Sequence, residues 1–128
     1  MSELDALVGY GLLVMVTLLL QATAKMSQLG VGYLMGSRDE QREVTGMAAR
    51  LDRALHNSIV ALTLFAPAVL LIILTGDKST GLTQTLALIF IIGRVIYLPS
   101  YVFGIKGVRS IAWAAGFFAT AALYIAAY

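Results

Sequence analysis

Four long stretches of the chain carry almost no charge, and this pattern constrains the fold more than any other feature. Only 12% of the 128 residues are charged, whereas 59% are hydrophobic. A soluble domain usually has about 25% charged residues, and one small core could not bury so much apolar surface. A helix needs about 20 apolar residues to cross the hydrocarbon of a bilayer. The sequence therefore predicts an all-α protein, a transmembrane four-helix bundle.

The bundle is expected to form one domain over residues 1–128, with spans over about 6–34, 50–74, 82–103 and 108–127. Gly30 weakens helix propensity late in the first span, and Pro67 is expected to kink the second. The tight turn at residues 75–81 makes the second and third spans antiparallel neighbours. The acidic N-terminus lacks the positive charge of a secretory signal, so the first span is expected to be retained.

The nine basic residues are distributed unevenly between the two ends of the expected bundle. One end, shared by the first and third connections, carries Lys25, Arg38, Arg42, Arg50, Arg53, Lys106 and Arg109. Only Lys78 lies clearly at the other end, and Arg94 lies within the third span. Cytoplasmic loops carry an excess of Lys and Arg, so the pattern predicts termini outside the cytoplasm. In a membrane protein such residues report topology, and we expect no nucleic-acid partner.

The composition disfavours both a metal site and proton-coupled transport. The chain has no cysteine and one histidine, which cannot supply a ligand set, so no metal site is expected. A proton-coupled transporter generally needs a carboxylate deep within a span. The acidic residues instead lie near span ends or in connections: Glu3, Asp5, Asp39, Glu40, Glu43, Asp52 and Asp77. A path for anions stays open as a third hypothesis.

Polar side chains recur at helical spacing near the basic end of the second span. A charged side chain inside a bilayer costs roughly 2.5–3.5 kcal/mol or more, so each charged residue within a span needs a structural or functional explanation. Arg50, Arg53 and Asn57 fall on one helical face. The arginines could instead snorkel to the interface, as basic residues near helix ends often do. His56 lies off this face and is expected to pack or cap. Asp52 could pair with a neighbouring arginine and carry no chemistry.

A second stripe begins at Arg94 and continues through Tyr97 and Tyr101, and Arg109 and Ser110 open the fourth span. The tyrosines alone would fit an interfacial belt. If the two stripes face each other, they form a basic pocket for an anionic, amphipathic guest, because arginine grips carboxylates bidentately. A cation or hydroxyl beside a thiol sulfur would also favour the nucleophilic thiolate.

Several of these segments together resemble one family. Residues 50–57, Arg-Leu-Asp-Arg-Ala-Leu-His-Asn, resemble the second-helix signature of the MAPEG family, the membrane-associated proteins of eicosanoid and glutathione metabolism. Residues 36–39 with Gly46 resemble the first connection of bacterial members. Residues 94–101 and 108–113 resemble the region that joins the third and fourth helices. The resemblance covers nearly the whole chain in the right order.

The resemblance implies a homotrimer in a bacterial inner membrane, with glutathione between neighbouring subunits near the cytoplasmic end. Members conjugate glutathione to lipophilic electrophiles, reduce lipid hydroperoxides, or act on eicosanoid precursors. Carried over by position, the glutathione contacts would be Arg50, Arg53 and Asn57, with the pocket lined by Arg94, Tyr97 and Tyr101. Arg109 or Ser110 would lie near the thiol and act in catalysis. Membrane lipid and lipophilic small molecules are the other expected partners.

One position departs from the family signature. The glutamate expected three residues after Asn57 is Val60 here, and in glutathione-using members this carboxylate helps hold the charged amine of the tripeptide. Two hypotheses follow. The chain is a glutathione-dependent transferase or peroxidase acting on lipophilic electrophiles, or it is a non-catalytic member whose basic pocket binds a lipid or another amphipathic anion.

Overall fold

The computed structural model describes residues 1–39 and 42–128, and all regular structure in this range is helical. Glu40 and Gln41, expected in a solvated connection, lie outside the described residues. The elements are α1 (Glu3–Leu29), α2 (Val31–Met35), α3 (Gly46–Leu74), α4 (Gly81–Val102) and α5 (Lys106–Ala127). All except the short α2 are long and apolar enough to cross a membrane. The predicted all-α bundle with four spans is confirmed.

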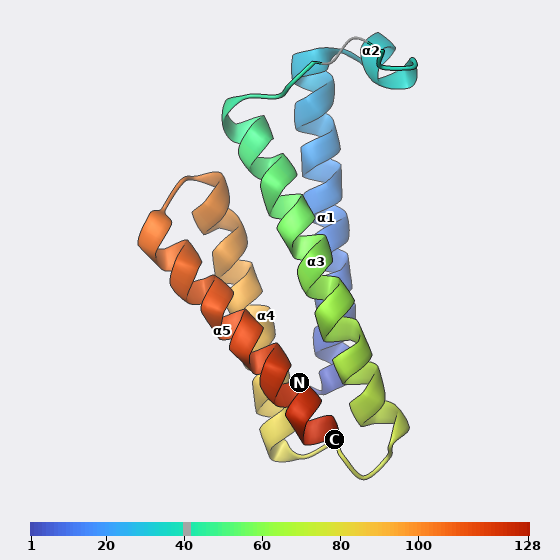
Figure 1. The fold of residues 1–128 in the computed structure, drawn as a ribbon, viewed down its shortest axis with the longest axis vertical. Coiled ribbons are helices and arrows are strands. Elements are labelled where there is room, and N and C mark those ends of the chain that lie inside the picture. The colour runs from blue at the N-terminus through green and yellow to red at the C-terminus, as the bar shows by residue number, and fades with distance from the viewer. Residues whose placement is uncertain (40–41) are drawn as a thin grey trace.

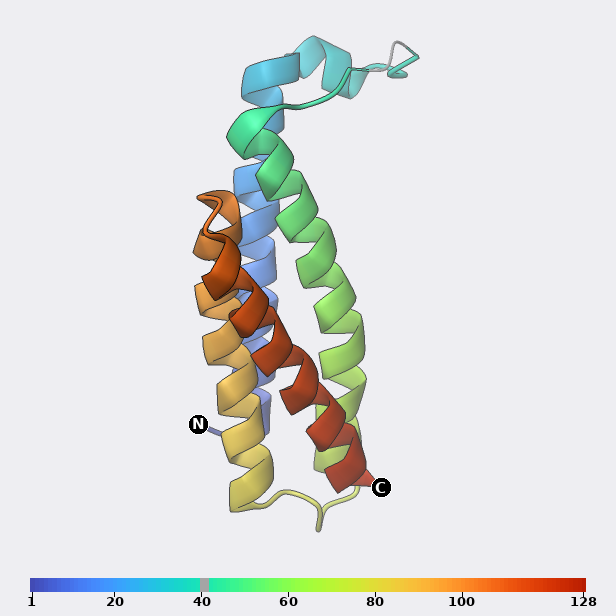
Figure 2. The same cartoon turned by 60° about the vertical axis from the view of Figure 1, so that its left-hand side comes forward.

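Two antiparallel helix pairs build the bundle: α1 lies beside α3, and α4 and α5 form a hairpin (Figures 1 and 2). Both termini and the α3–α4 connection lie at one end. The α1–α3 and α4–α5 connections lie at the opposite end, which we call the basic end because seven basic residues gather there. In Figure 1 the α4–α5 hairpin leans away from α3 toward this end, and α1 and α3 extend beyond it.

The helix bounds differ from the expected spans at two places. α1 ends at Leu29 because Gly30 adopts φ +87°, a conformation open to glycine, and the chain then forms the separate α2 rather than one helix to residue 34. α3 begins at Gly46, four residues before the expected start. Arg50 and Arg53 therefore lie one and two turns inside α3 rather than at its first residues. α3 continues through Pro67 as a single helix.

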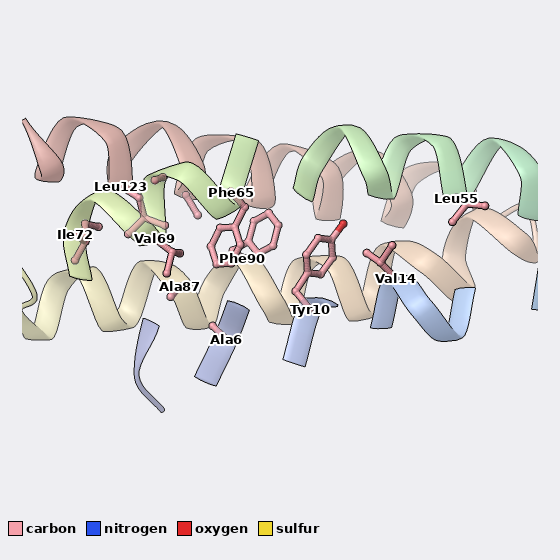
Figure 3. Close-up of a cluster of buried hydrophobic side chains, with 12 residues drawn as sticks. Ala6, Tyr10, Val14, Leu55, Phe65, Val69, Ile72, Ala87, Phe90 and Leu123 are labelled. Atoms are coloured by element: carbon pink, nitrogen blue, oxygen red, sulfur yellow. The ribbon is translucent and has the colours of Figure 1, made fainter. Parts of the chain in front are cut away.

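Aromatic side chains from three helices fill the centre of the bundle (Figure 3). The rings of Phe65 in α3 and Phe90 in α4 stack with centroids 3.8 Å apart. Tyr10 in α1 meets Phe90 edge to face at 4.8 Å, and its hydroxyl donates to the carbonyl oxygen of Ser58 at 2.8 Å. Because all three rings are fully buried, this cluster holds α1, α3 and α4 together.

The terminal end is fixed by polar contacts. The buried carboxylate of Glu3 accepts hydrogen bonds from the hydroxyls of Ser79 and Thr83, which joins the start of α1 to the α3–α4 connection and α4. Ser2 and Asp5 cap the first turn of α1 reciprocally. The terminal end is therefore tied across three elements: α1, the α3–α4 connection and α4.

Close approach of α4 and α5 depends on Gly93. A Cβ atom at this position would lie 3.0 Å from the carbonyl oxygen of Ala112, a contact that the backbone cannot relieve cheaply. We expect Gly93→Ala to destabilise the protein by about 1–3 kcal/mol through overpacking. Gly116→Ala is the matched control, since a Cβ there meets side-chain atoms at ordinary distances of 3.5 Å or more. Thermal unfolding in detergent checks this, and equal melting temperatures for both variants would contradict it.

Candidate functional site

The two predicted stripes meet at the basic end. Arg53 of α3 donates from Nε to the hydroxyl of Tyr101 in α4 at 2.9 Å. The guanidinium carbon of Arg109, in the first turn of α5, lies 5.0 Å from the centroid of the Tyr101 ring. Tyr101 thus stands between two cations from different helices. The two stripes therefore face each other at Arg53 and Tyr101, which is the condition on which the basic pocket was inferred.

These residues border an open pocket of about 620 Å³ between α3 and α4, which we call the basic pocket. It is lined by Asp52, Arg53, Leu55, His56, Asn57, Ile59, Tyr97 and Tyr101. Arg53 and His56 are exposed on the surface of the single chain. The pocket combines a cation, hydroxyls and an amide, the groups that recognise a charged peptide-like molecule.

Arg50 has a different environment from Arg53. Its Nε donates to the carbonyl oxygen of Val102, the last residue of α4, at 2.7 Å. Cations near helix C-termini are stabilised by the unpaired carbonyls and the helix dipole. This contact joins α3 to the end of α4 and positions the residues of the basic pocket. A direct role of Arg50 in ligand binding stays a prediction.

Asp52 pairs with two residues of α1 rather than with a neighbouring arginine. Its Oδ1 accepts from Nε2 of Gln21 at 2.8 Å and lies 3.7 Å from the ammonium of Lys25. The direction of the side chain explains this, because Asp52 lies on the face of α3 that packs on α1. Arg53 points toward α4, and its charge is not neutralised by Asp52.

Arg94 lies deeper than the other arginines and has only 3% of its surface exposed. Its guanidinium stacks over the ring of Tyr97 at 4.2 Å and lies 5.9 Å from the Tyr10 ring. Its Nη2 donates to the hydroxyl of Ser58 at 3.2 Å. Its buried Nε has no hydrogen-bond partner within the part of the chain that the structure describes. Sequence spacing grouped Arg94 with Tyr101, but the structure gives it a separate, buried setting.

A second cavity of about 420 Å³ opens between α3, α4 and α5, and we call it the apolar cleft. It is lined by Asn57, Val60, Ala61, Leu64, Phe90, Arg94, Trp113, Gly116, Phe117, Thr120, Ala121 and Tyr124. Asn57 borders both cavities, and its buried Oδ1 has no partner among the described residues. A polar cavity and an apolar one therefore adjoin at Asn57.

Two positions from the sequence prediction lie away from the basic pocket. Ser110 is exposed, and its hydroxyl donates to the carbonyl oxygen of Lys106 at 3.2 Å, within its own helix. Val60 and Arg94 both line the apolar cleft. A carboxylate at position 60 would therefore face the cleft that Arg94 borders. The assignments of Arg109 and Ser110 to catalysis stay predictions.

Sequence spacing missed two polar residues around Arg94. Tyr10 and Ser58 come from α1 and α3, and both lie buried beside its guanidinium. A weak signal exists, because a tyrosine in the apolar first span and a serine next to Asn57 are unusual in lipid-facing positions. The sequence alone does not identify Arg94 as the partner of Tyr10 and Ser58, because these contacts depend on how three helices pack together.

The fold defines the class: an integral membrane protein built as a bundle of four spanning helices. Comparison with protein families then places it more closely. The sequence model of the MAPEG family matches residues 6–128, essentially the whole chain, so the protein belongs to this family of eicosanoid and glutathione metabolism. Neither a curated protein nor a solved structure matches the chain significantly.

Proposed function

We propose that the protein is a glutathione-dependent transferase or peroxidase that acts on lipophilic electrophiles. The observation that supports this most is the adjacency of the two cavities at Asn57. The reaction joins a charged, water-soluble thiol to a molecule dissolved in lipid, so it needs a polar site that touches an apolar one. Family membership supports the choice of glutathione as the thiol.

In this proposal, three residues of the basic pocket and the adjacent Arg109 each have a defined task. Arg53 binds a carboxylate of glutathione, and Asn57 pairs with a peptide group. Tyr101, between Arg53 and Arg109, fixes the orientation of both cations. Arg109 lies near the sulfur and stabilises the thiolate, so no side-chain base is required.

The chemical step follows from the thiolate. The thiol proton leaves to solvent, the thiolate sulfur attacks the electrophilic carbon, and a carbon–sulfur bond forms. With an aryl halide the halide then departs with its electron pair, whereas with an unsaturated aldehyde the resulting enolate takes up a proton from water. With a hydroperoxide, the sulfur attacks the terminal oxygen and releases an alcohol, and a second glutathione then gives the disulfide and water. In both cases the acceptor enters the apolar cleft laterally from lipid.

A second candidate function is non-catalytic binding of a lipid or another amphipathic anion in the basic pocket. Val60 favours this alternative, because no carboxylate is present at that position to hold the amine of glutathione. Lipid extracted from the purified protein distinguishes the two. An anionic lipid that glutathione cannot displace supports binding without catalysis, whereas ready displacement supports the transferase.

Family membership and the charge distribution support a proposed assembly and orientation. We infer a homotrimer in a bacterial inner membrane, with the basic end in the cytoplasm. Native mass spectrometry tests the trimer, and a monomer under mild detergent contradicts it. Because the chain has no cysteine, Lys78→Cys creates a single labelling site. An impermeant maleimide that fails to label this site from outside the cell contradicts the orientation.

The proposed activity is tested with purified protein reconstituted in lipid. Glutathione is supplied with a panel of lipophilic acceptors that includes aryl halides, unsaturated aldehydes and alkyl hydroperoxides. We expect conjugation or disulfide formation above the uncatalysed rate, and loss of this rate in Arg53→Ala. A wild-type rate that equals the protein-free rate with every acceptor would overturn the proposal.

A further inference from the structure

The wall of the basic pocket carries charges of both signs. Asp52 and Arg53 both line it, and neither side chain is buried. Among the described residues the structure records one ion pair, which joins Asp52 to Lys25, so Asp52 and Arg53 are not paired with each other. A pocket that presents a cation and an anion separately suits a ligand that carries both charges, as the amino-acid end of a peptide does.

Two side chains of α1 hold the carboxylate of Asp52 in place through one of its oxygens. Nε2 of Gln21 donates to Oδ1 at 2.8 Å, and the ammonium nitrogen of Lys25 lies 3.7 Å from the same atom. No hydrogen bond to Oδ2 is recorded in the part of the chain that the structure describes, and 46% of the side-chain surface is exposed. Oδ2 can therefore accept a hydrogen bond from a ligand while Oδ1 keeps its contacts with α1.

Position 60, where the family signature has a glutamate, does not belong to the basic pocket in this chain. Val60 lines the apolar cleft, whereas Asp52 lines the basic pocket together with Arg53 and Asn57. Asp52 is also the one carboxylate among the residues that line either cavity. The replacement of the glutamate by valine therefore leaves the basic pocket with a carboxylate of its own, one turn and a half earlier on the same helix.

We propose that Asp52 binds the charged amine of glutathione and thereby restricts the thiol substrate to molecules with a free amino group. This inference rests on the proposed glutathione chemistry and names the residue that recognises the amine. Oδ2 of Asp52 accepts a hydrogen bond from the ammonium, while Arg53 binds a carboxylate. With this contact the site needs no acid at position 60, so Val60 is compatible with a working transferase.

The amine contact is measured with a matched pair of ligands. Glutathione is compared with deaminoglutathione, which keeps the thiol, the peptide groups and both carboxylates but has hydrogen in place of the amino group. Dissociation constants are determined by isothermal titration calorimetry on protein in phosphatidylcholine nanodiscs, at about pH 6.5, where the amine is protonated and the carboxylates are ionised. We expect the wild type to bind glutathione roughly five- to tenfold more tightly, the effect of one charge-assisted hydrogen bond to a half-exposed carboxylate.

Three variants assign this preference to Asp52. Asp52→Asn removes the charge with little change in size and should reduce the ratio of the two dissociation constants to about twofold or less. Glu43→Gln is the matched control, because it removes an exposed carboxylate of the basic end that does not line the pocket, and it should keep the wild-type ratio. Lys25→Gln removes the cation that shares the Asp52 carboxylate, so the ratio should rise about two- to threefold. This variant retains Asp52 and decides the matter if Asp52→Asn does not fold.

Several results would overturn the role of Asp52 and leave the proposed function standing. These are equal binding of the two ligands by the wild type, a wild-type ratio that persists in Asp52→Asn, an equal fall of the ratio in Glu43→Gln, and a ratio that does not rise in Lys25→Gln. In each case glutathione still binds. If the wild type binds neither ligand, the glutathione chemistry itself fails, and the role of Asp52 fails with it, so the two failures are distinguishable.

Discussion

Replacement of Arg109 by alanine is expected to lower kcat for glutathione transfer by about 100-fold, the usual cost of losing one group that stabilises charge at the reacting atom. In the proposal, Arg109 holds the thiolate. Without this cation the thiol pKa rises toward its value in water, so the rising limb of the pH–rate profile should move to higher pH. The measurement is kcat and KM across a pH series with an aryl halide acceptor.

The control for this prediction is Lys106→Ala, which removes an exposed positive charge three residues earlier on the same helix. It should leave kcat near the wild-type value. Arg109→Lys keeps the charge and should recover part of the rate. An Arg109→Ala variant that changes KM alone, or that behaves like Lys106→Ala, would show that Arg109 does not act on the thiol.

The largest stability effect is expected for Phe90→Ala. Phe90 is 1% exposed, stacks on Phe65 and meets Tyr10 edge to face, so its removal leaves a cavity where three helices join. Such truncations cost about 3–5 kcal/mol. Unfolding of reconstituted protein by a graded denaturing detergent measures the loss.

Phe118→Ala provides the comparison for Phe90→Ala, because Phe118 lies on α5 and is 68% exposed. Its side chain exchanges one apolar environment for another, so its loss should cost far less. Equal destabilisation by the two variants would contradict the aromatic cluster as the centre of the bundle.

Much of the fold follows directly from the sequence. Four apolar stretches fix four spans, and the distribution of basic residues separates the two ends. Helical spacing also groups Arg53 and Tyr101 into two stripes, but only the packing of α3 on α4 shows that these two residues meet.

Other features depend on packing that spacing alone does not determine. The break at Gly30 requires a φ of +87°, which a general helix propensity does not specify. Asp52 contacts Lys25 and Gln21 because α3 packs on α1 at this position. Helical spacing within α3 does not reveal which helix lies beside Asp52. Arg94 separates from Tyr101 because residues two turns apart lie at different depths. One stripe therefore borders two cavities.

Equilibrium binding of glutathione to the purified protein tests the central claim most directly. Wild type, Arg53→Ala and Lys106→Ala are compared, since the two variants each remove one positive charge at the basic end. The proposal predicts saturable binding in the micromolar to low-millimolar range for wild type and Lys106→Ala, and its loss in Arg53→Ala. Absence of saturable binding to the wild type, or equal binding to all three proteins, would contradict a glutathione site in the basic pocket.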